Sequence, residues 1–139
     1  MKQFCCKSFL LLITYSLVLL VRLSLWLRPA QTVSFLGCHS LSPLEKVKMV
    51  YPVSSLVWAV ERSSALPLGQ MKCLGRALVT QTLMLLSGHT SKVCFGVAKE
   101  PHNQIEAHAW VEYQGRIIIG QLNNMSRFYP LSTWMMAEK

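Results

Sequence analysis

Residues 105–120, IEAHAWVEYQGRIIIG, carry the clearest structural pattern in this chain. Apolar, β-branched and aromatic residues dominate 105–113 and 116–120, which predicts two strands. The Gln-Gly pair between them is a turn signal, so the two strands should form an antiparallel hairpin. The two-residue period of the first strand divides its side chains between two faces: Glu106, His108, Trp110 and Glu112 on one, and Ala107, Ala109, Val111 and Tyr113 on the other.

The segments before this hairpin predict helices and one more strand. Residues 92–98, KVCFGVA, have strand composition, and residues 74–87 and 53–65 have helical spacing of apolar residues. The first of these helices has an apolar stripe made of Leu74, Ala77, Leu78, Leu85 and Leu86, with Gln81 and Thr82 along it. Residues 30–52 are predicted to be a linker with a short helix around 43–50. Helices followed by an antiparallel sheet define an α+β fold.

The first thirty residues are strongly apolar. Residues 8–21 carry no charge, but fourteen helical residues are too few to cross a bilayer, and extension to 27 includes Arg22. Three interpretations stay open: a docked or peripheral helix, a membrane span, and a signal peptide that lacks a typical cleavage site. Pro29 ends the helix in each case. We therefore expect a hydrophobic helix within 1–30 and a folded domain over 31–139.

The composition limits the classes of function. The chain has 139 residues and a net charge of +8, but its fourteen basic residues are scattered, so no nucleic-acid partner is expected. Five cysteines without a CxxC pair predict neither a disulfide scaffold nor a structural zinc site. Cys38 and His39 also lack paired ligand spacing. We expect a cytoplasmic protein with reduced thiols and no metal or cofactor, with membrane association through residues 8–27 as a further possibility.

Cys73 and His108 are the candidate catalytic pair. Cys73 lies at the start of the helix predicted at about 74–87, where free backbone N–H groups and the helix dipole favour a thiolate. Lys72 and Arg76 add positive charge nearby in sequence. An imidazole on a strand can serve such a thiol as a base. The alternative is that Cys73 is a small buried apolar residue, which is how we interpret Cys94 in the middle of its strand.

The chain also resembles a known family at four motifs: CLGRAL (73–78), FGVAKE (95–100), AHAWVEYQGRIIIG (107–120) and MSRFYPL (125–131). Together they are similar to the transglutaminase-like leader peptidases of lasso-peptide biosynthesis, the second B protein of those gene clusters. The resemblance implies a papain-like cysteine peptidase fold, with Cys73 as nucleophile and His108 as general base. It also implies three partners: a lasso precursor peptide, a small protein that grips its leader, and a lasso cyclase.

The chain departs from the family pattern at the third catalytic position. The family has an aspartate after the hairpin, near Gly120 and Gln121 here, and this chain contains no aspartate. Gln121 is our first candidate for the residue that orients the imidazole, with Asn123 and Glu112 as alternatives. Two further classes of function stay open. One is a catalytically impaired scaffold of the same fold, and the other is a small membrane-associated binding protein.

Overall fold

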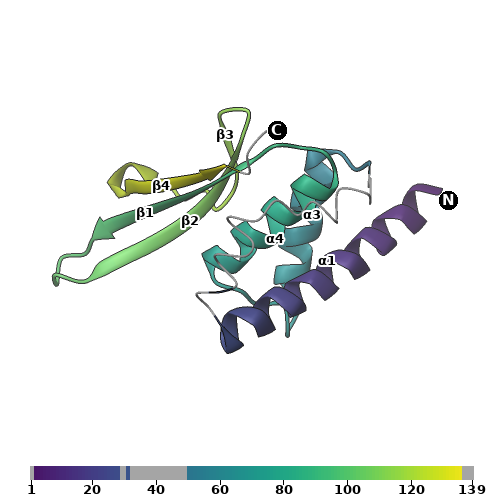
Figure 1. The fold of residues 1–139 in the computed structure, drawn as a ribbon, viewed down its shortest axis with the longest axis horizontal. Helices are drawn as coiled ribbons and strands as arrows, with labels where there is room; N and C mark the ends of the chain where they lie inside the picture. Colours follow the sequence, from purple (N-terminus) through teal and green to yellow (C-terminus); the bar gives the residue numbers. More distant parts are fainter. Residues whose placement is uncertain (1, 29–30, 32–49, 136–139) are drawn as a thin grey trace.

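The computed structural model describes residues 2–28, 31 and 50–135. The predicted linker and the short helix around 43–50 lie largely outside these residues. The helices are α1 (Lys2–Leu27), α3 (Val53–Ser64) and α4 (Cys73–Leu86), and the strands are β1 (Lys92–Lys99), β2 (Ile105–Tyr113), β3 (Arg116–Ile119) and β4 (Tyr129–Met135). A short 3₁₀ helix, Met125–Arg127, precedes β4. Helices followed by an antiparallel sheet confirm the predicted α+β class (Figure 1).

The four strands form one antiparallel sheet in the order β3-β2-β1-β4. Gln114 and Gly115 join β2 to β3 with φ values of 50° and 75°, the left-handed conformations that a tight hairpin turn requires. The hairpin predicted from the Gln-Gly pair is thus confirmed. β4 is absent from the predicted elements. It pairs with the far edge of β1, with a register shift between Phe95 and Gly96, and only the folded chain brings these two segments together.

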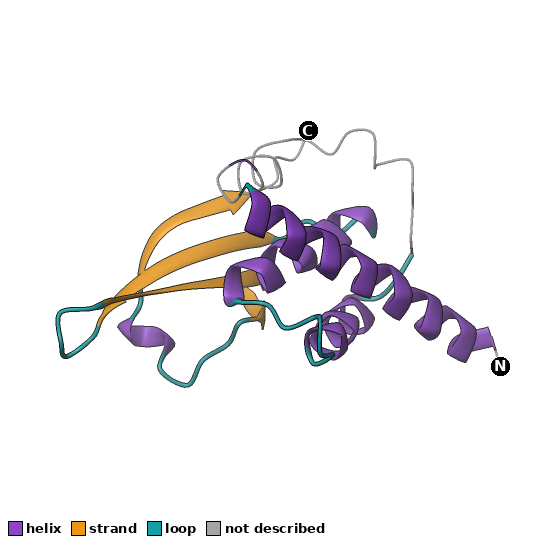
Figure 2. Ribbon diagram, turned by 90° about the horizontal axis from the view of Figure 1, so that it is seen from below, coloured by secondary structure: helices purple, strands orange, loops and turns teal. Residues whose placement is uncertain are grey.

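Helix α4 lies between the sheet and the other two helices (Figures 1 and 2). Its whole central part, from Ala77 to Met84, is buried, because β2 covers one side and α1 and α3 cover the other. The prediction of a single apolar stripe therefore underestimates how much of this helix is buried. Two buried hydroxyls on α4 bond to the preceding turn: Thr80 Oγ1 donates to the Arg76 carbonyl at 2.8 Å, and Thr82 Oγ1 donates to the Leu78 carbonyl at 2.9 Å.

One side of α1 packs against α3 and α4 and belongs to the same core as the rest of the protein. Its buried residues recur at helical spacing: Leu10, Thr14, Val18 and Val21. At its C-terminal end, Arg22 Nη1 donates to the Leu68 carbonyl at 2.6 Å, which ties the loop between α3 and α4 to the helix. By length and composition alone, the segment 6–27 could also cross a membrane, with a mean hydropathy of 2.1. The division of the chain near residue 30 stays a prediction.

Candidate active site

Cys73 is the first residue of α4, as predicted, and Lys72 occupies the N-cap position in an extended conformation. The first backbone N–H groups of a helix have no intrahelical partners, so they can donate to an anion placed there. Cys73 is a free, partly buried thiol. It therefore combines access to solvent with the positive end of a helix.

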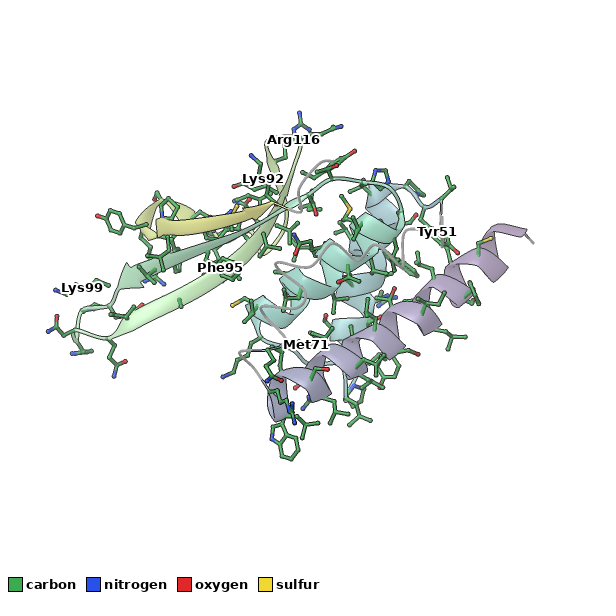
Figure 3. All side chains as sticks on the ribbon, in the orientation of Figure 1. Tyr51, Met71, Lys92, Phe95, Lys99 and Arg116 are labelled. Atoms are coloured by element: carbon green, nitrogen blue, oxygen red, sulfur yellow. The ribbon has the colours of Figure 1, made fainter. Side chains whose placement is uncertain are left out.

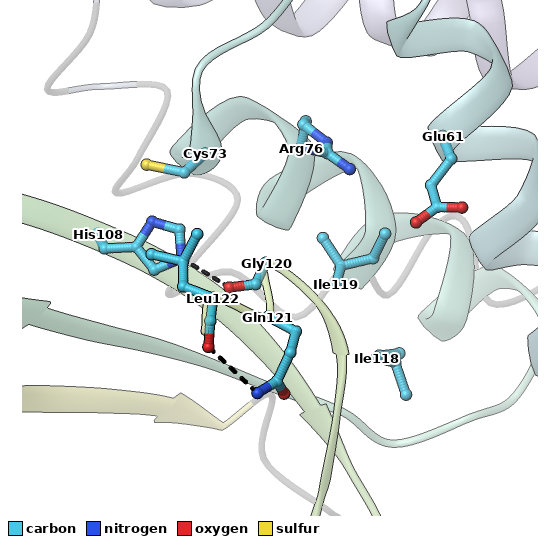
Figure 4. A pocket seen from close by; sticks show the side chains of 9 residues that line it. All are labelled: Glu61, Cys73, Arg76, His108, Ile118, Ile119, Gly120, Gln121 and Leu122. Carbon is cyan, nitrogen blue, oxygen red and sulfur yellow. Dashed lines mark hydrogen bonds between the residues drawn. The ribbon is translucent and has the colours of Figure 1, made fainter. Parts of the chain in front are cut away.

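Cys73 and His108 line the same pocket, which has a volume of about 240 Å³ (Figure 4). Its walls come from α3, α4, β2, β3 and the segment after β3: Glu61, Cys73, Arg76, His108, Ile118, Ile119, Gly120, Gln121 and Leu122. Figure 4 shows the thiol and the imidazole together on one side of the pocket, and Arg76 and Glu61 on the other. The fold thus brings together two residues that are thirty-five positions apart in the sequence.

The imidazole of His108 is held by a backbone carbonyl. His108 Nε2 lies 2.7 Å from the Gly120 oxygen. A carbonyl oxygen only accepts, so Nε2 carries the hydrogen and the neutral ring keeps its lone pair on Nδ1. In Figure 4 this other nitrogen lies on the side of the ring nearer Cys73. The geometry therefore selects the tautomer that leaves a proton acceptor on the thiol side.

Two aromatic rings pack against the imidazole. Trp110 stacks on His108 with ring centroids 6.1 Å apart, and Phe128 lies 5.5 Å away at a tilted angle. The indole is held in turn, because Trp110 Nε1 donates to Glu112 Oε1 at 2.9 Å. These contacts agree with the predicted face of β2 that carries His108, Trp110 and Glu112. Phe128 and the Gly120 carbonyl are site components that the sequence analysis did not assign.

Phe128 is anchored by an ion-pair cluster at the end of the sheet. Arg127, just before it, donates to Glu100 Oε1 at 2.8 Å and also pairs with Glu106. The hydrogen bond from Arg127 holds the pKa of the Glu100 carboxyl below its usual value. Because Glu100 follows β1 and Glu106 belongs to β2, the cluster fixes the 3₁₀ helix to both strands. The ring of Phe128 is thereby placed beside the imidazole.

The three candidates for the orienting residue lie in different surroundings. Gln121 lines the pocket, but its amide nitrogen donates to the Leu122 carbonyl at 3.5 Å. The Glu112 carboxylate accepts from Trp110, and Asn123 is exposed. In the described part of the chain, the imidazole of His108 is instead hydrogen-bonded to the Gly120 carbonyl. An orienting role for any of these three side chains stays a prediction.

Gly120 is fitted to this position by its lack of a side chain. Its φ of 85° lies in the region that favours glycine. A Cβ here would lie 2.9 Å from the Ala109 carbonyl oxygen, which is closer than real Cβ contacts, and 3.0 Å from Trp110 Cβ, which is a tight contact. The backbone of Gly120 therefore approaches β2 closely, and this approach brings its carbonyl to His108.

Arg76 supplies positive charge to the pocket from one turn further along α4. Its Nε atom is buried and has no hydrogen-bond partner among the described residues. A guanidinium beside a pocket attracts negative charge, whether on a thiolate, an oxyanion or a bound carboxylate. Arg76 thus offers one positive group to chemistry that develops negative charge, on the same side of the pocket as the Glu61 carboxylate.

The other described cysteines lie outside the pocket. Cys94 is buried in β1, and desolvation, with a smaller contribution from the nearby Glu112 carboxylate, raises the pKa of its thiol to about 11. Such a thiol is protonated and unreactive near neutral pH. Cys6 is exposed on α1. Within the described residues, no group of three or more His, Cys, Asp or Glu side chains is placed to hold a metal ion.

A helix that begins with a cysteine, packed on an antiparallel sheet that carries a histidine, is the arrangement of the papain-like cysteine peptidase class. Comparison with protein families agrees: residues 17–133 match the transglutaminase-like superfamily. The chain therefore belongs to the transglutaminase-like superfamily, and the match begins within α1. Searches of curated proteins and of solved structures found no match.

Proposed function

We propose that this protein is a cysteine peptidase that removes the leader from a lasso-peptide precursor, with Cys73 as nucleophile and His108 as general base. The observation that carries the proposal is the shared pocket, which is lined by a thiol at a helix start and by an imidazole whose Nε2 is bonded to the Gly120 carbonyl. Membership of the transglutaminase-like superfamily supports the class of chemistry. The four sequence motifs support the choice of substrate.

The mechanism is acyl transfer in two steps. His108 Nδ1 takes the proton of the Cys73 thiol, and the thiolate attacks the scissile carbonyl. The backbone N–H groups that open α4 stabilise the oxyanion that forms. The imidazolium then donates its proton to the leaving amine, which is the new N-terminus of the core peptide. Water, deprotonated by His108, hydrolyses the thioester and releases the leader as a carboxylic acid.

A backbone carbonyl takes the place of the third member in this chemistry. In the family, a carboxylate orients the imidazole and stabilises its positive charge. The Gly120 oxygen provides the same hydrogen bond without a formal charge. A cysteine enzyme tolerates this change better than a serine enzyme, because the thiol ionises far more readily than a hydroxyl. Gln121 lies next in the chain and remains the first side-chain candidate.

The proposed partners follow from the resemblance. A small separate protein would hold the leader as an added strand, and a cyclase would use the freed amine to close the ring. The pocket is bordered by Arg76 and Glu61, so a bound peptide would meet one charge of each sign. No metal or other cofactor is needed for these steps.

Leader cleavage followed by mass spectrometry tests this function. Purified protein would be mixed with a lasso precursor and its leader-binding partner, and compared with Cys73→Ala and His108→Ala. Cys6→Ala is the matched control, because this thiol is exposed on α1 and lies outside the pocket. We expect cleavage by the wild type and the control, and loss in both pocket variants. A folded wild type that leaves the precursor intact would instead support a catalytically impaired scaffold.

A further inference from the structure

The side of α1 that faces away from α3 and α4 is an apolar surface (Figure 3). We define its outer stripe by residues that recur every three or four positions: Phe9, Leu12, Ser16, Leu20, Leu23 and Leu27. The five apolar members are each between 52% and 67% exposed, and Ser16 is exposed as well. At 1.5 Å per residue the stripe is about 27 Å long. A continuous apolar strip of this size is unusual on the surface of a soluble monomer.

The two sides of α1 have different neighbours. Leu10, Val18 and Val21 are between 0% and 3% exposed in the core, and they lie on the side of the helix opposite the outer stripe. An amphipathic helix would place polar residues where this stripe lies. Here both sides are apolar, so the outer stripe also requires an apolar environment.

The charges around the helix indicate the chemistry of that environment. Lys2, Lys7 and Arg22 are its charged residues, Arg28 follows its last residue, and the first acid in the chain is Glu45. Trp26, 79% exposed, lies between the two arginines at the C-terminal end. Tryptophan and basic residues are the side chains that anchor a helix in the headgroup region of anionic membranes.

We propose that α1 lies in the plane of an anionic lipid bilayer, with its outer stripe among the acyl chains and its opposite side on α3 and α4. The stripe offers one hydroxyl and no charge, so it can supply few of the direct hydrogen bonds that a typical protein–protein interface contains. A transmembrane orientation would remove Leu10, Val18 and Val21 from the core. The in-plane orientation keeps that packing and also covers the stripe.

Vesicle flotation tests this orientation directly. The full-length protein would be mixed with vesicles of phosphatidylcholine alone or of phosphatidylcholine and phosphatidylglycerol. We expect flotation with the anionic vesicles, weaker flotation with the neutral ones, and a loss of about tenfold or more in binding for Leu20→Glu/Leu23→Glu. The matched control is Ile105→Glu/Leu131→Glu, which changes residues that are 75% and 67% exposed on the sheet. This control should float like the wild type.

Three results would overturn the proposal. Equal flotation of the stripe variant and the wild type would show that the stripe is not the lipid contact. Retention of the wild type on vesicles after alkaline carbonate washing would identify a membrane span. Dimerisation in light scattering that the stripe variant abolishes, without flotation of the wild type, would show that a second copy covers the stripe. Circular dichroism would confirm that the variants are folded. Lipid binding through α1 needs no catalytic activity, so it is tested separately from leader cleavage.

Discussion

His108 depends on an acceptor that belongs to the backbone and therefore cannot be removed by substitution of a side chain. The 2.7 Å bond to the Gly120 carbonyl fixes which ring nitrogen carries the hydrogen. Trp110 and Phe128 limit the rotation of the ring. A chain without aspartate can thus still orient the imidazole of His108, provided that the segment after β3 keeps its close approach to β2.

Substitutions at Gly120 and Gln121 distinguish the backbone acceptor from a side-chain acceptor. We expect Gln121→Ala to keep the rate of leader cleavage within about threefold, because the exposed amide bonds to Leu122 and not to His108. We expect Gly120→Ala to lower the rate by about tenfold to a hundredfold, since the new Cβ must push the carbonyl away from the ring. Melting curves would show that both variants are folded.

The opposite pattern would assign the orienting role to Gln121. In that case Gln121→Ala would lose activity and Gln121→Asp would keep or raise it, because a carboxylate would then occupy the position that it has in the family. The two variants therefore give opposite results under the two assignments.

The Cys94 thiol should make the domain less stable as the pH rises in the alkaline range. In the unfolded chain this thiol ionises near its ordinary pKa of 9.0, whereas burial and then the charge of Glu112 raise its pKa to about 11 in the folded protein. Between these two values the unfolded state binds fewer protons, so the free energy of unfolding falls as the pH rises. We expect Cys94→Ala to make this fall shallower. Urea unfolding at about pH 8 and about pH 10.5 measures the difference.

The pH dependence of the free energy of unfolding, compared between wild type and Cys94→Ala, separates the effect of ionisation from that of packing. Removal of the Cys94 sulfur leaves the same small cavity at both pH values, so its cost cancels in the pH dependence. Identical slopes for wild type and variant would show that Cys94 does not ionise with a raised pKa.

At the scale of elements, local patterns predicted most of the helices and strands. The ends of β2 agree with the prediction, and α3, α4, β1 and β3 agree within about one residue, because each has its own periodicity and turn signals. β4 pairs with β1 through contacts more than thirty residues apart, which no local pattern reveals. The same reason limits how much of the candidate site the sequence can predict. Cys73 and His108 stand out by local context, but Phe128 and the Gly120 carbonyl become neighbours of His108 only after folding.

Gly96 links the packing of β1 to the position of the imidazole. A Cβ at this residue would lie 3.0 Å from two atoms of the Trp110 ring and 3.1 Å from Phe128 Cβ. Gly96→Ala should therefore displace the two rings that pack on His108 and lower stability by about 1–3 kcal/mol. We expect leader cleavage to fall further than the loss of folded protein explains. Urea unfolding and cleavage rates at matched folded fractions measure the two effects.

Gly88→Ala provides the comparison for this substitution. Gly88 has no atom within 4 Å of the position of a Cβ, but its φ of 75° also disfavours alanine. The Gly88→Ala variant should therefore lose stability through backbone strain and keep the cleavage rate per folded molecule. A normal rate per folded molecule for Gly96→Ala as well would show that Trp110 and Phe128 do not act through the imidazole.

For the molecule as a whole, α1 contributes one side to the common hydrophobic core. Its buried side chains belong to the same cluster as Leu56 of α3 and Leu78 of α4, and the superfamily match begins within the helix at residue 17. The proposed membrane contact uses the other side of the same helix. Under this proposal, attachment to lipid and folding of the domain are coupled through one element.

Leu10 and Leu12 separate the two roles of α1, because they differ in burial on the same helix. Leu10 is 0% exposed and Leu12 is 67% exposed. We expect Leu10→Ala to lower the free energy of unfolding by about 2–5 kcal/mol, as for other fully buried leucines. Leu12→Ala should change it by less than about 0.5 kcal/mol. Urea unfolding without lipid measures both values, and equal small effects would mean that α1 is separable from the domain, as the predicted boundary near residue 30 implies.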